Sequence, residues 1–214
     1  MTAAAAPQRV PYPAAARTLL RDTVLTAVDD LVRSRGWSAT TMTDVASAAG
    51  VSRQTLYNEF GSRDEFGQAL VIREGGRFLD EVEQAIGDHA EDPGAALTAA
   101  LERFLTIADD DPFVRLLLAD DGTAGLLPLV TTQSAPLVDW ASGRLVEAID
   151  VRWPGVARED LRALADVLVR LAISHVAAPR DLPGRTAASI TRLLAPAIEH
   201  MLTGARDPAR TPPD

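Results

Sequence analysis

A short run of side chains, from residue 53 to residue 58, has the chemistry needed to read the edges of DNA bases. An arginine can donate two parallel hydrogen bonds to guanine, and a glutamine can pair in a similar way with adenine. A threonine methyl group can contact the methyl group of thymine. Arg53, Gln54 and Thr55 supply these three groups in succession. The run therefore indicates contact with a DNA groove, provided that it lies on an exposed face.

No catalytic or metal-binding arrangement competes with this interpretation. The sequence has no cysteine, its three histidines (His89, His175 and His200) are far apart, and it has no glycine-rich phosphate loop. The acidic runs at 109–111 and 120–121 are typical of solvated helix ends. We therefore expect no catalytic residue, no metal ion and no cofactor, and we exclude zinc fingers and disulfide scaffolds.

Residues 41–63 have the pattern of a helix-turn-helix, which would place these side chains on its second helix. Thr41 and Ser52 stand where the N-caps of two short helices are expected, and a glycine provides the turn between those helices. Leu56 and Phe60, four residues apart, would anchor the second helix to the core. The outward-facing residues are then Arg53, Gln54, Thr55, Tyr57 and Asn58.

The composition predicts an all-α fold of about nine helices. Alanine and leucine are abundant, and 47% of residues are hydrophobic, enough to fill a core. The first helix is expected from about Ala14 to Arg35, with Leu19 and Leu20 on its inner face. The expected division is a disordered tail at 1–13, a DNA-binding domain at 14–61, a second helical domain at 62–203 and a tail at 204–214.

Charge is distributed unevenly between these domains. Residues 1–63 carry seven arginines and five acids, or +2, whereas residues 64–214 carry 14 arginines and 25 acids, or −11, within a total of −9. An acidic second domain repels phosphate, so DNA contact should be confined to the N-terminal domain. No apolar run reaches the ~18 residues that a membrane span needs, and the N-terminus lacks a signal sequence. We expect a cytoplasmic protein without membrane contact.

From Thr18 to Leu70 the chain resembles the TetR family of transcriptional regulators. The shared features are the Thr41 cap, the AxxAGVS segment at 46–52, the Leu56-Tyr57 pair, Phe60, and the Ser62-Arg63 pair before the next helix. The resemblance implies a three-helix DNA-binding domain, followed by a helical domain that binds an effector and dimerises. It further implies that Thr41, Ser52, Tyr57 and Arg63 contact phosphates of a double-stranded, pseudo-palindromic operator.

Glu59 departs from the pattern of the family. A carboxylate on the second helix of the motif repels phosphate unless it accepts a hydrogen bond from cytosine or pairs with an arginine. Both alternatives are open from the sequence.

The resemblance implies a homodimeric repressor that a small molecule releases from DNA. Few charges interrupt the apolar positions of the second domain, so we expect a mainly apolar effector. The candidate pocket residues are Phe78, Val82, Phe104, Phe113, Leu117, Leu137, Trp140, Ser174 and His175. A regulator of the same fold that responds to a protein partner, or that is architectural, is the alternative; a solid core would favour it and a cavity would favour the effector.

The dimer interface is expected on the last two long helices, at about 158–178 and 183–203. Their apolar residues at helical spacing are Leu161, Leu164, Leu168, Leu171, Ile190, Leu193, Leu194, Ala197 and Met201. Such stripes serve the core of a single chain equally well. Gly75-Gly76, within the expected fourth helix, indicates either a hinge or close packing against another helix.

Overall fold

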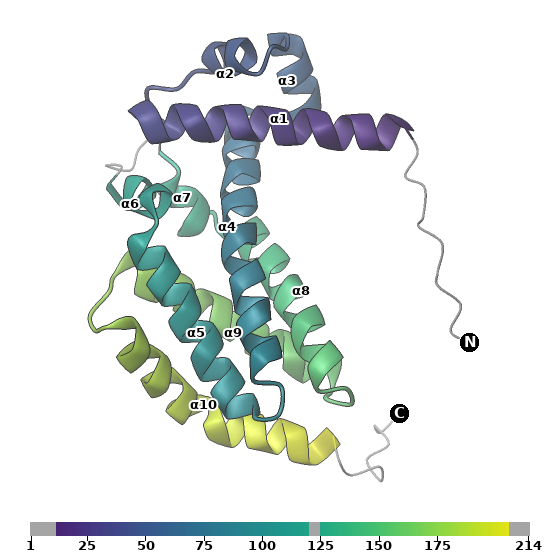
Figure 1. The fold of residues 1–214 in the computed structure, drawn as a ribbon, viewed down its shortest axis with the longest axis vertical. Helices are drawn as coiled ribbons and strands as arrows, with labels where there is room; N and C mark the ends of the chain where they lie inside the picture. The colour runs from purple at the N-terminus through teal and green to yellow at the C-terminus, as the bar shows by residue number, and fades with distance from the viewer. Residues whose placement is uncertain (1–11, 120–124, 206–214) are drawn as a thin grey trace. The chain divides into compact units, whose positions relative to one another are not determined.

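The computed structural model describes residues 12–119 and 125–205, and within these ranges all regular secondary structure is helical (Figure 1). The predicted all-α fold is confirmed, with one more helix than expected, because the segment before Ala135 contains the short α7. The predicted tails and residues 120–124 lie largely outside the described ranges. The helices are α1 (Tyr12–Arg35), α2 (Met42–Ala48), α3 (Arg53–Phe60), α4 (Arg63–Asp88), α5 (Pro93–Asp110), α6 (Pro112–Ala119), α7 (Leu127–Val130), α8 (Ala135–Arg152), α9 (Arg158–Ala177) and α10 (Pro183–Ala205).

The chain divides into two compact units, residues 1–70 and residues 71–214. The division falls inside α4, whereas we expected the domain boundary at its start. Among the described residues, no helix is long and apolar enough to cross a membrane.

The first unit is built from α1, α2, α3 and the first turns of α4. Its core contains fully buried residues from each helix: Val24, Val28, Val32, Val45, Leu56, Phe66 and Leu70. Gly50 has a φ of 67°, the left-handed conformation that a tight turn between α2 and α3 requires. Leu19 is 68% exposed, so its predicted inward orientation was wrong. The physical reason is that residues 13–19 are all exposed, because α1 begins before the part of the helix that is packed into the core.

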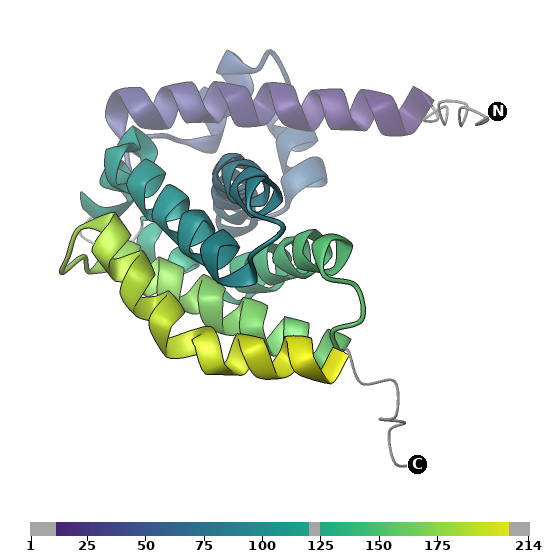
Figure 2. The same ribbon diagram turned by 60° about the horizontal axis from the view of Figure 1, so that its bottom comes forward.

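The second unit consists of α5 to α10 and the rest of α4, and most of these helices share one hydrophobic core. Helix α10 lies along α5, and α8 packs against α9 (Figures 1 and 2). Figure 2 views α4 nearly end-on, with α5 and α8 on either side of it. The core combines Leu79, Val82 and Ile86 of α4 with apolar residues of α5, α8, α9 and α10.

Close packing explains the first of the two adjacent glycines in α4. The helix runs without interruption through Gly75 and Gly76. A Cβ atom added to Gly75 would lie 3.3 Å from Cζ3 of Trp140 on α8, whereas one added to Gly76 would be 3.9 Å from the same ring system. The first distance is tighter than an ordinary van der Waals contact, so Gly75 makes room for the indole ring.

This difference makes the two glycines a matched pair for mutation. We predict that Gly76→Ala raises the free energy of unfolding by about 1 kcal/mol, the usual difference between alanine and glycine in a helix. Gly75→Ala should gain clearly less, because Trp140 must move. Urea denaturation of both variants measures this difference, and equal stabilisation would contradict the packing explanation.

Candidate DNA-binding surface and effector cavity

Helix α2 begins with a reciprocal capping arrangement. The Asp44 N–H donates to Oγ1 of Thr41 over 3.2 Å, and the Thr41 N–H donates to Oδ2 of Asp44 over 2.9 Å. Hydrogen bonds from the Thr41 hydroxyl and then from its N–H hold the pKa of Asp44 below its ordinary value. Thr41 is therefore confirmed as the N-cap, while its contact with phosphate stays a prediction.

Helix α3 presents an exposed polar face of the kind that the sequence predicted. Oγ of Ser52 accepts from the N–H of Thr55 over 3.0 Å, which confirms Ser52 as the cap, and Leu56 and Phe60 are buried. The exposed residues are Arg53, Gln54, Tyr57 and Asn58. Thr55 is half-buried instead, and its hydroxyl lies 2.8 Å from the Ser52 hydroxyl.

Two contacts fix the orientation of side chains on this face. Nε2 of Gln54 donates to Oδ1 of Asn58 over 2.8 Å, one turn further along α3. The guanidinium of Arg53 lies 6.0 Å from the ring centroid of Tyr57. The groups predicted to read bases are thus held in a defined arrangement before any DNA is present, and their contact with bases stays a prediction.

Arg63 has a structural role that the sequence analysis did not anticipate. Its Nη1 donates to the carbonyl oxygen of Thr40 over 2.6 Å, and its Nη2 donates to that of Trp37 over 2.7 Å. Its guanidinium also stacks on the Trp37 ring, 4.4 Å from the centroid. Arg63 therefore fastens the start of α4 to the loop between α1 and α2. Its predicted contact with phosphate is not tested by these bonds.

Glu59 pairs with two arginines of α1, which answers the question that the sequence left open. Arg17 Nε and Arg21 Nη1 lie 2.8 Å and 2.9 Å from Oε1 of Glu59. Burial opposes ionisation of the carboxyl, but the hydrogen bonds and charges of Arg21 and Arg17 outweigh it, so the pKa of Glu59 is lowered. The carboxylate therefore joins α3 to α1.

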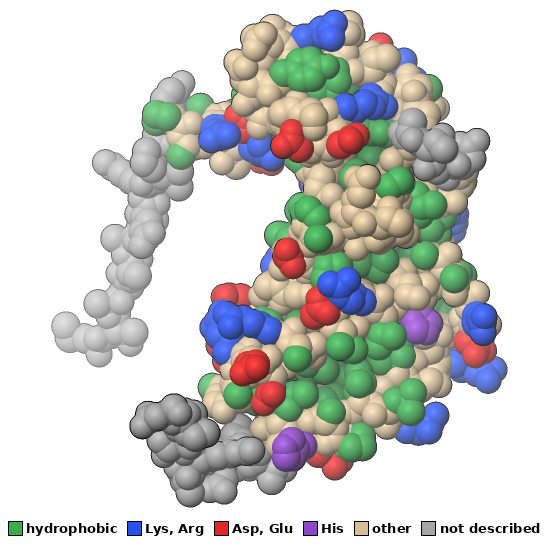
Figure 3. Space-filling view, turned by 180° about the vertical axis from the view of Figure 1, so that it is seen from behind, with side chains coloured by type: hydrophobic (Ala, Val, Ile, Leu, Met, Phe, Trp, Pro, Cys, Tyr) green, Lys and Arg blue, Asp and Glu red, His purple; other side chains and the backbone are tan. Residues whose placement is uncertain are grey.

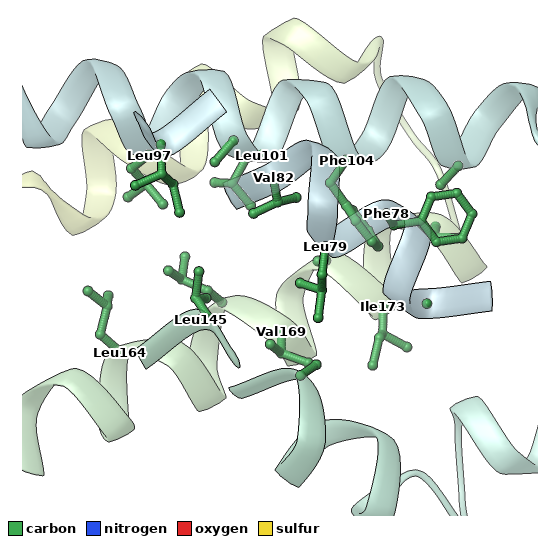
Figure 4. Close-up of a pocket in the computed structure, with 18 of the residues that line it drawn as sticks. Phe78, Leu79, Val82, Leu97, Leu101, Phe104, Leu145, Leu164, Val169 and Ile173 are labelled. Atoms are coloured by element: carbon green, nitrogen blue, oxygen red, sulfur yellow. The ribbon is translucent and has the colours of Figure 1, made fainter. Parts of the chain in front are cut away.

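An apolar cavity of about 200 Å³ lies in the second unit. In Figure 4, Leu97, Leu101 and Phe104 lie on one side of the space and Leu164 and Ile173 on the other, and the side chains drawn carry only carbon. Helices α4, α5, α8 and α9 supply most of the wall. Such a cavity is suited to an apolar ligand.

The residues that line the cavity can be compared with the predicted pocket residues. Ser174 and His175 do not line it, so their predicted positions were wrong: Ser174 is exposed, and Nδ1 of His175 lies 2.8 Å from the carbonyl oxygen of Leu171. The apolar positions of α9 face the cavity, and these two residues do not. Seven predicted residues do line it, namely Phe78, Val82, Phe104, Phe113, Leu117, Leu137 and Trp140.

The sequence analysis missed two features of this wall. Glu74 of α4 is the one charged residue among the described lining residues; it is buried, and its Oε2 lies 3.0 Å from Nη1 of Arg77. Trp153 also lines the cavity, and its Nε1 donates to the carbonyl oxygen of Ala90 over 3.1 Å. A lone acid within a helix or a tryptophan before a proline carries no signal that would have identified them. No cluster of metal-binding side chains occurs in the part of the chain that is described.

Most of the predicted interface residues face the core of their own chain, which corrects that assignment. Leu161, Leu168 and Ile190 are buried, whereas Leu164, Leu171, Leu194 and Met201 pack against the same core. Only Leu193 and Ala197 of the predicted set are exposed. The stripes were correctly identified as apolar, but a core-facing stripe has the same spacing as an interface stripe.

Another apolar surface is available on these helices. Val167 of α9 and Leu193 of α10 are exposed, Leu193 to 71%. Figure 3 shows, on the lower part of the face drawn there, hydrophobic side chains gathered between two histidines with few charged groups among them. Exposed large apolar side chains in such a cluster are typical of a surface that a protein partner covers.

Sequence profiles of two protein families match the chain. The profile described as "Bacterial regulatory proteins, tetR family" matches residues 24–70, the region of α1 to α4 that contains the helix-turn-helix. The profile described as "Bacterial Tetracyclin repressor, C-terminal domain" matches residues 92–196, within the unit that holds the cavity.

Full-length relatives extend the match. The HTH-type transcriptional regulator AlkX of Mycobacterium tuberculosis is 40% identical over 192 residues, covering 90% of this chain and 91% of the relative. The crystal structure of the TetR family repressor AlkX from a Dietzia species, implicated in biodegradation of n-alkanes, is 35% identical with a TM-score of 0.73, covering 85% of this chain and 96% of that one. The structure of RolR in complex with resorcinol shares the fold, with 18% identity, a TM-score of 0.57 and coverage of 94% and 98%. The two AlkX proteins are named as a transcriptional regulator and a repressor, and not as enzymes.

The Glu59 pairing predicts a specific dependence of stability on pH. Because the pKa of Glu59 is lowered by folding, its stabilising effect is complete above the ordinary glutamate pKa of about 4.3 and is lost as the pH falls through the lower, folded-state pKa. We expect Glu59→Gln to lower the melting temperature at pH 7. The difference from the wild type should shrink as the pH falls below about 4. Glu147→Gln, which breaks an exposed pair with Arg158 in the second unit, is the matched control. A deficit of Glu59→Gln that stays constant down to acid pH would contradict the pairing.

Proposed function

Since this chain belongs to the TetR family of bacterial regulatory proteins, we propose that it is a homodimeric repressor that leaves its operator when an apolar molecule fills the cavity. It is a DNA-binding transcriptional regulator, and we propose that it acts in the cytoplasm, where its partner DNA lies. The observation that carries the proposed control by an effector is the apolar cavity, because a solid core would have left no place for one. This observation also disfavours control by a protein partner alone.

The exposed face of α3 is the proposed operator contact. In a helix-turn-helix, the second helix enters the major groove and the residues near its N-terminus reach the base edges. Arg53 and Gln54 occupy that position, and we propose that Thr41, Ser52 and Tyr57 bind the phosphates beside it. The charge of residues 1–63 is only +2, so one copy should bind weakly.

Two copies in a dimer solve this problem, because they place two recognition helices in successive major grooves, ~34–36 Å apart. A pseudo-palindromic operator follows from the symmetry of such a dimer. We propose that a second copy covers the exposed face around Val167 of α9 and Leu193 of α10, in place of the buried stripe predicted from the sequence.

The shape of the cavity supports a linear hydrocarbon chain as the effector. On α4 the lining extends from Val71 to Ile86, which spans about 22 Å at 1.5 Å per residue. On α9 it extends from Leu161 to Ala177, which is about 24 Å. A volume of about 200 Å³ over that length is a narrow channel and not a round chamber. An extended alkane advances about 1.3 Å per C–C bond and its two terminal methyl groups add about 4 Å, so a chain of roughly 16 carbons matches that length.

The similarity to a repressor implicated in n-alkane biodegradation favours the same chemical class. Glu74 is the one charged residue on the described wall, and Arg77 holds its carboxylate. A ligand with a carboxylate at that point would meet like charge, whereas a hydrocarbon chain would meet apolar groups along the rest of the channel.

The proposed operator contact can be tested with a DNA fragment that the purified protein selects from a random-sequence pool. We predict that Tyr57→Ala weakens binding to all sequences, because it removes a phosphate contact. Arg53→Ala should change the preference at one base pair, at a cost of about 1–3 kcal/mol. Electrophoretic mobility shifts measure both effects, and size-exclusion chromatography checks that the oligomeric state is kept. Unchanged binding by both variants would rule out this docking.

The proposed effector class predicts a dependence on chain length. Affinity for linear alkanes should rise about fourfold per methylene, as expected for ~0.8 kcal/mol per buried CH₂, and should stop rising near 16 carbons. Trp140 and Trp153 line the channel, so intrinsic fluorescence reports binding. Ala100→Phe should lower the limiting chain length, because Ala100 faces the channel. Ala99→Phe, on the same helix but away from the wall, is the control. Affinity that does not vary with chain length would contradict the channel.

A further inference from the structure

We propose that Arg17 of α1 is a further contact to the DNA backbone, held beside the recognition helix by Glu59. This inference rests on the proposed contact of α3 with operator DNA. The family resemblance did not assign any residue of α1 to DNA contact. The observation that carries it is the cluster of Arg17, Arg21 and Glu59, in which the two arginines have different surroundings.

Arg21 is occupied by structural contacts. Its Nη1 donates to the backbone carbonyl of Glu59 over 3.1 Å and to the carboxylate over 2.9 Å. Its guanidinium also lies 4.5 Å from the ring centroid of Phe60. A cation is favourable at this place, because the last carbonyl groups of a helix carry partial negative charge. Arg21 thus fastens the end of α3 to α1.

Arg17, like Arg21, is hydrogen-bonded through a single nitrogen, but its side chain is the more exposed of the two. Its Nε donates to both carboxylate oxygens of Glu59, over 2.8 Å and 2.9 Å, and its side chain is 65% exposed, against 11% for Glu59. Within the described residues, its Nη1 and Nη2 make no hydrogen bond to protein. A guanidinium has five N–H donors in a fixed fork, so four remain for another acceptor. Arg17 can therefore keep its bond to Glu59 while it binds a phosphate.

The charge of the cluster favours this contact. One carboxylate faces two guanidinium groups, so the cluster keeps a net positive charge, and Arg21 alone is sufficient to neutralise Glu59. A positively charged, exposed fork that matches phosphate geometry is the usual form of an arginine contact to nucleic acid. Glu59, which would repel phosphate by itself, becomes the residue that positions Arg17.

Glu59 lies on a different side of α3 from the base-reading face, so Arg17 is not placed to read bases. At 100° per residue, Glu59 falls between half-buried Thr55 and buried Leu56, nearly opposite the middle of the exposed face. A helix in the major groove has the sugar-phosphate backbone along its edges, and contacts there position the protein without reading sequence. Arg17 is expected to contact that backbone, and Arg53 and Gln54 are expected to contact the bases.

The test compares Arg17→Gln with Arg185→Gln in the full-length protein, using the selected DNA fragment over a range of salt concentrations. Arg185 is 76% exposed and pairs with Asp181 in the second unit, so its substitution removes the same charge far from α3 in sequence. Each lost phosphate contact lowers the slope of log K against log salt by about 0.9, so a dimer of Arg17→Gln should lose about 1.8. Affinity should fall with an unchanged base preference. Arg17→Lys should restore most of the slope, because the charge returns.

The outcomes separate this inference from the proposed function. If wild-type protein selects DNA but Arg17→Gln keeps the slope and affinity of Arg185→Gln, Arg17 has only a structural role and the inference is overturned. A lower melting temperature for Arg17→Gln with an unchanged salt slope leads to the same conclusion. If wild-type protein selects no DNA at all, both the inference and the proposed operator contact fail.

Discussion

One continuous helix contributes to both hydrophobic cores of this chain, and the rest of the structure depends on that constraint. Phe66 and Leu70, in the first turns of α4, are fully buried in the DNA-binding unit. Later turns of the same helix supply Phe78, Val82 and Ile86 to the wall of the cavity. Because a packed core resists continuous deformation, a movement of α4 in one core must be accommodated in the other. In the proposed control of DNA binding, α4 is therefore the element through which a ligand in the cavity acts on the DNA-binding unit.

The cavity is costly for the fold, which is an argument that it has a function. At about 24 cal/mol per Å³, a cavity of about 200 Å³ leaves roughly 5 kcal/mol of packing energy unrealised. That is comparable to the whole stability of many domains, so a neutral defect of this size is difficult to explain. A hydrocarbon chain would recover the missing contacts. Gly75 has the opposite role nearby, because it lets Trp140 pack closely where α4 borders the cavity.

The fold class and the caps of the recognition motif were predictable from the sequence, because they depend on residues close together in the chain. Thr41 and Ser52 cap helices through bonds to backbone N–H groups three residues away. The role of Glu59 was not predictable, since its partners are more than 35 residues distant on α1. The surroundings of Leu161 were not predictable either. Periodicity shows that a helix has an apolar stripe, but it does not show whether that stripe faces a core, a cavity or a second chain.

The central claim is that filling the cavity and binding the operator are coupled, and reciprocity tests it most directly. Coupling requires that operator DNA weaken hydrocarbon binding by the same factor by which the hydrocarbon weakens DNA binding. The measurement is the dissociation constant of hexadecane, followed by fluorescence of the cavity tryptophans, with and without saturating operator. We predict weaker hexadecane binding in the presence of operator, by the factor found in the reverse titration. Equal affinity for hexadecane with and without operator would contradict the claim, even if the cavity is filled.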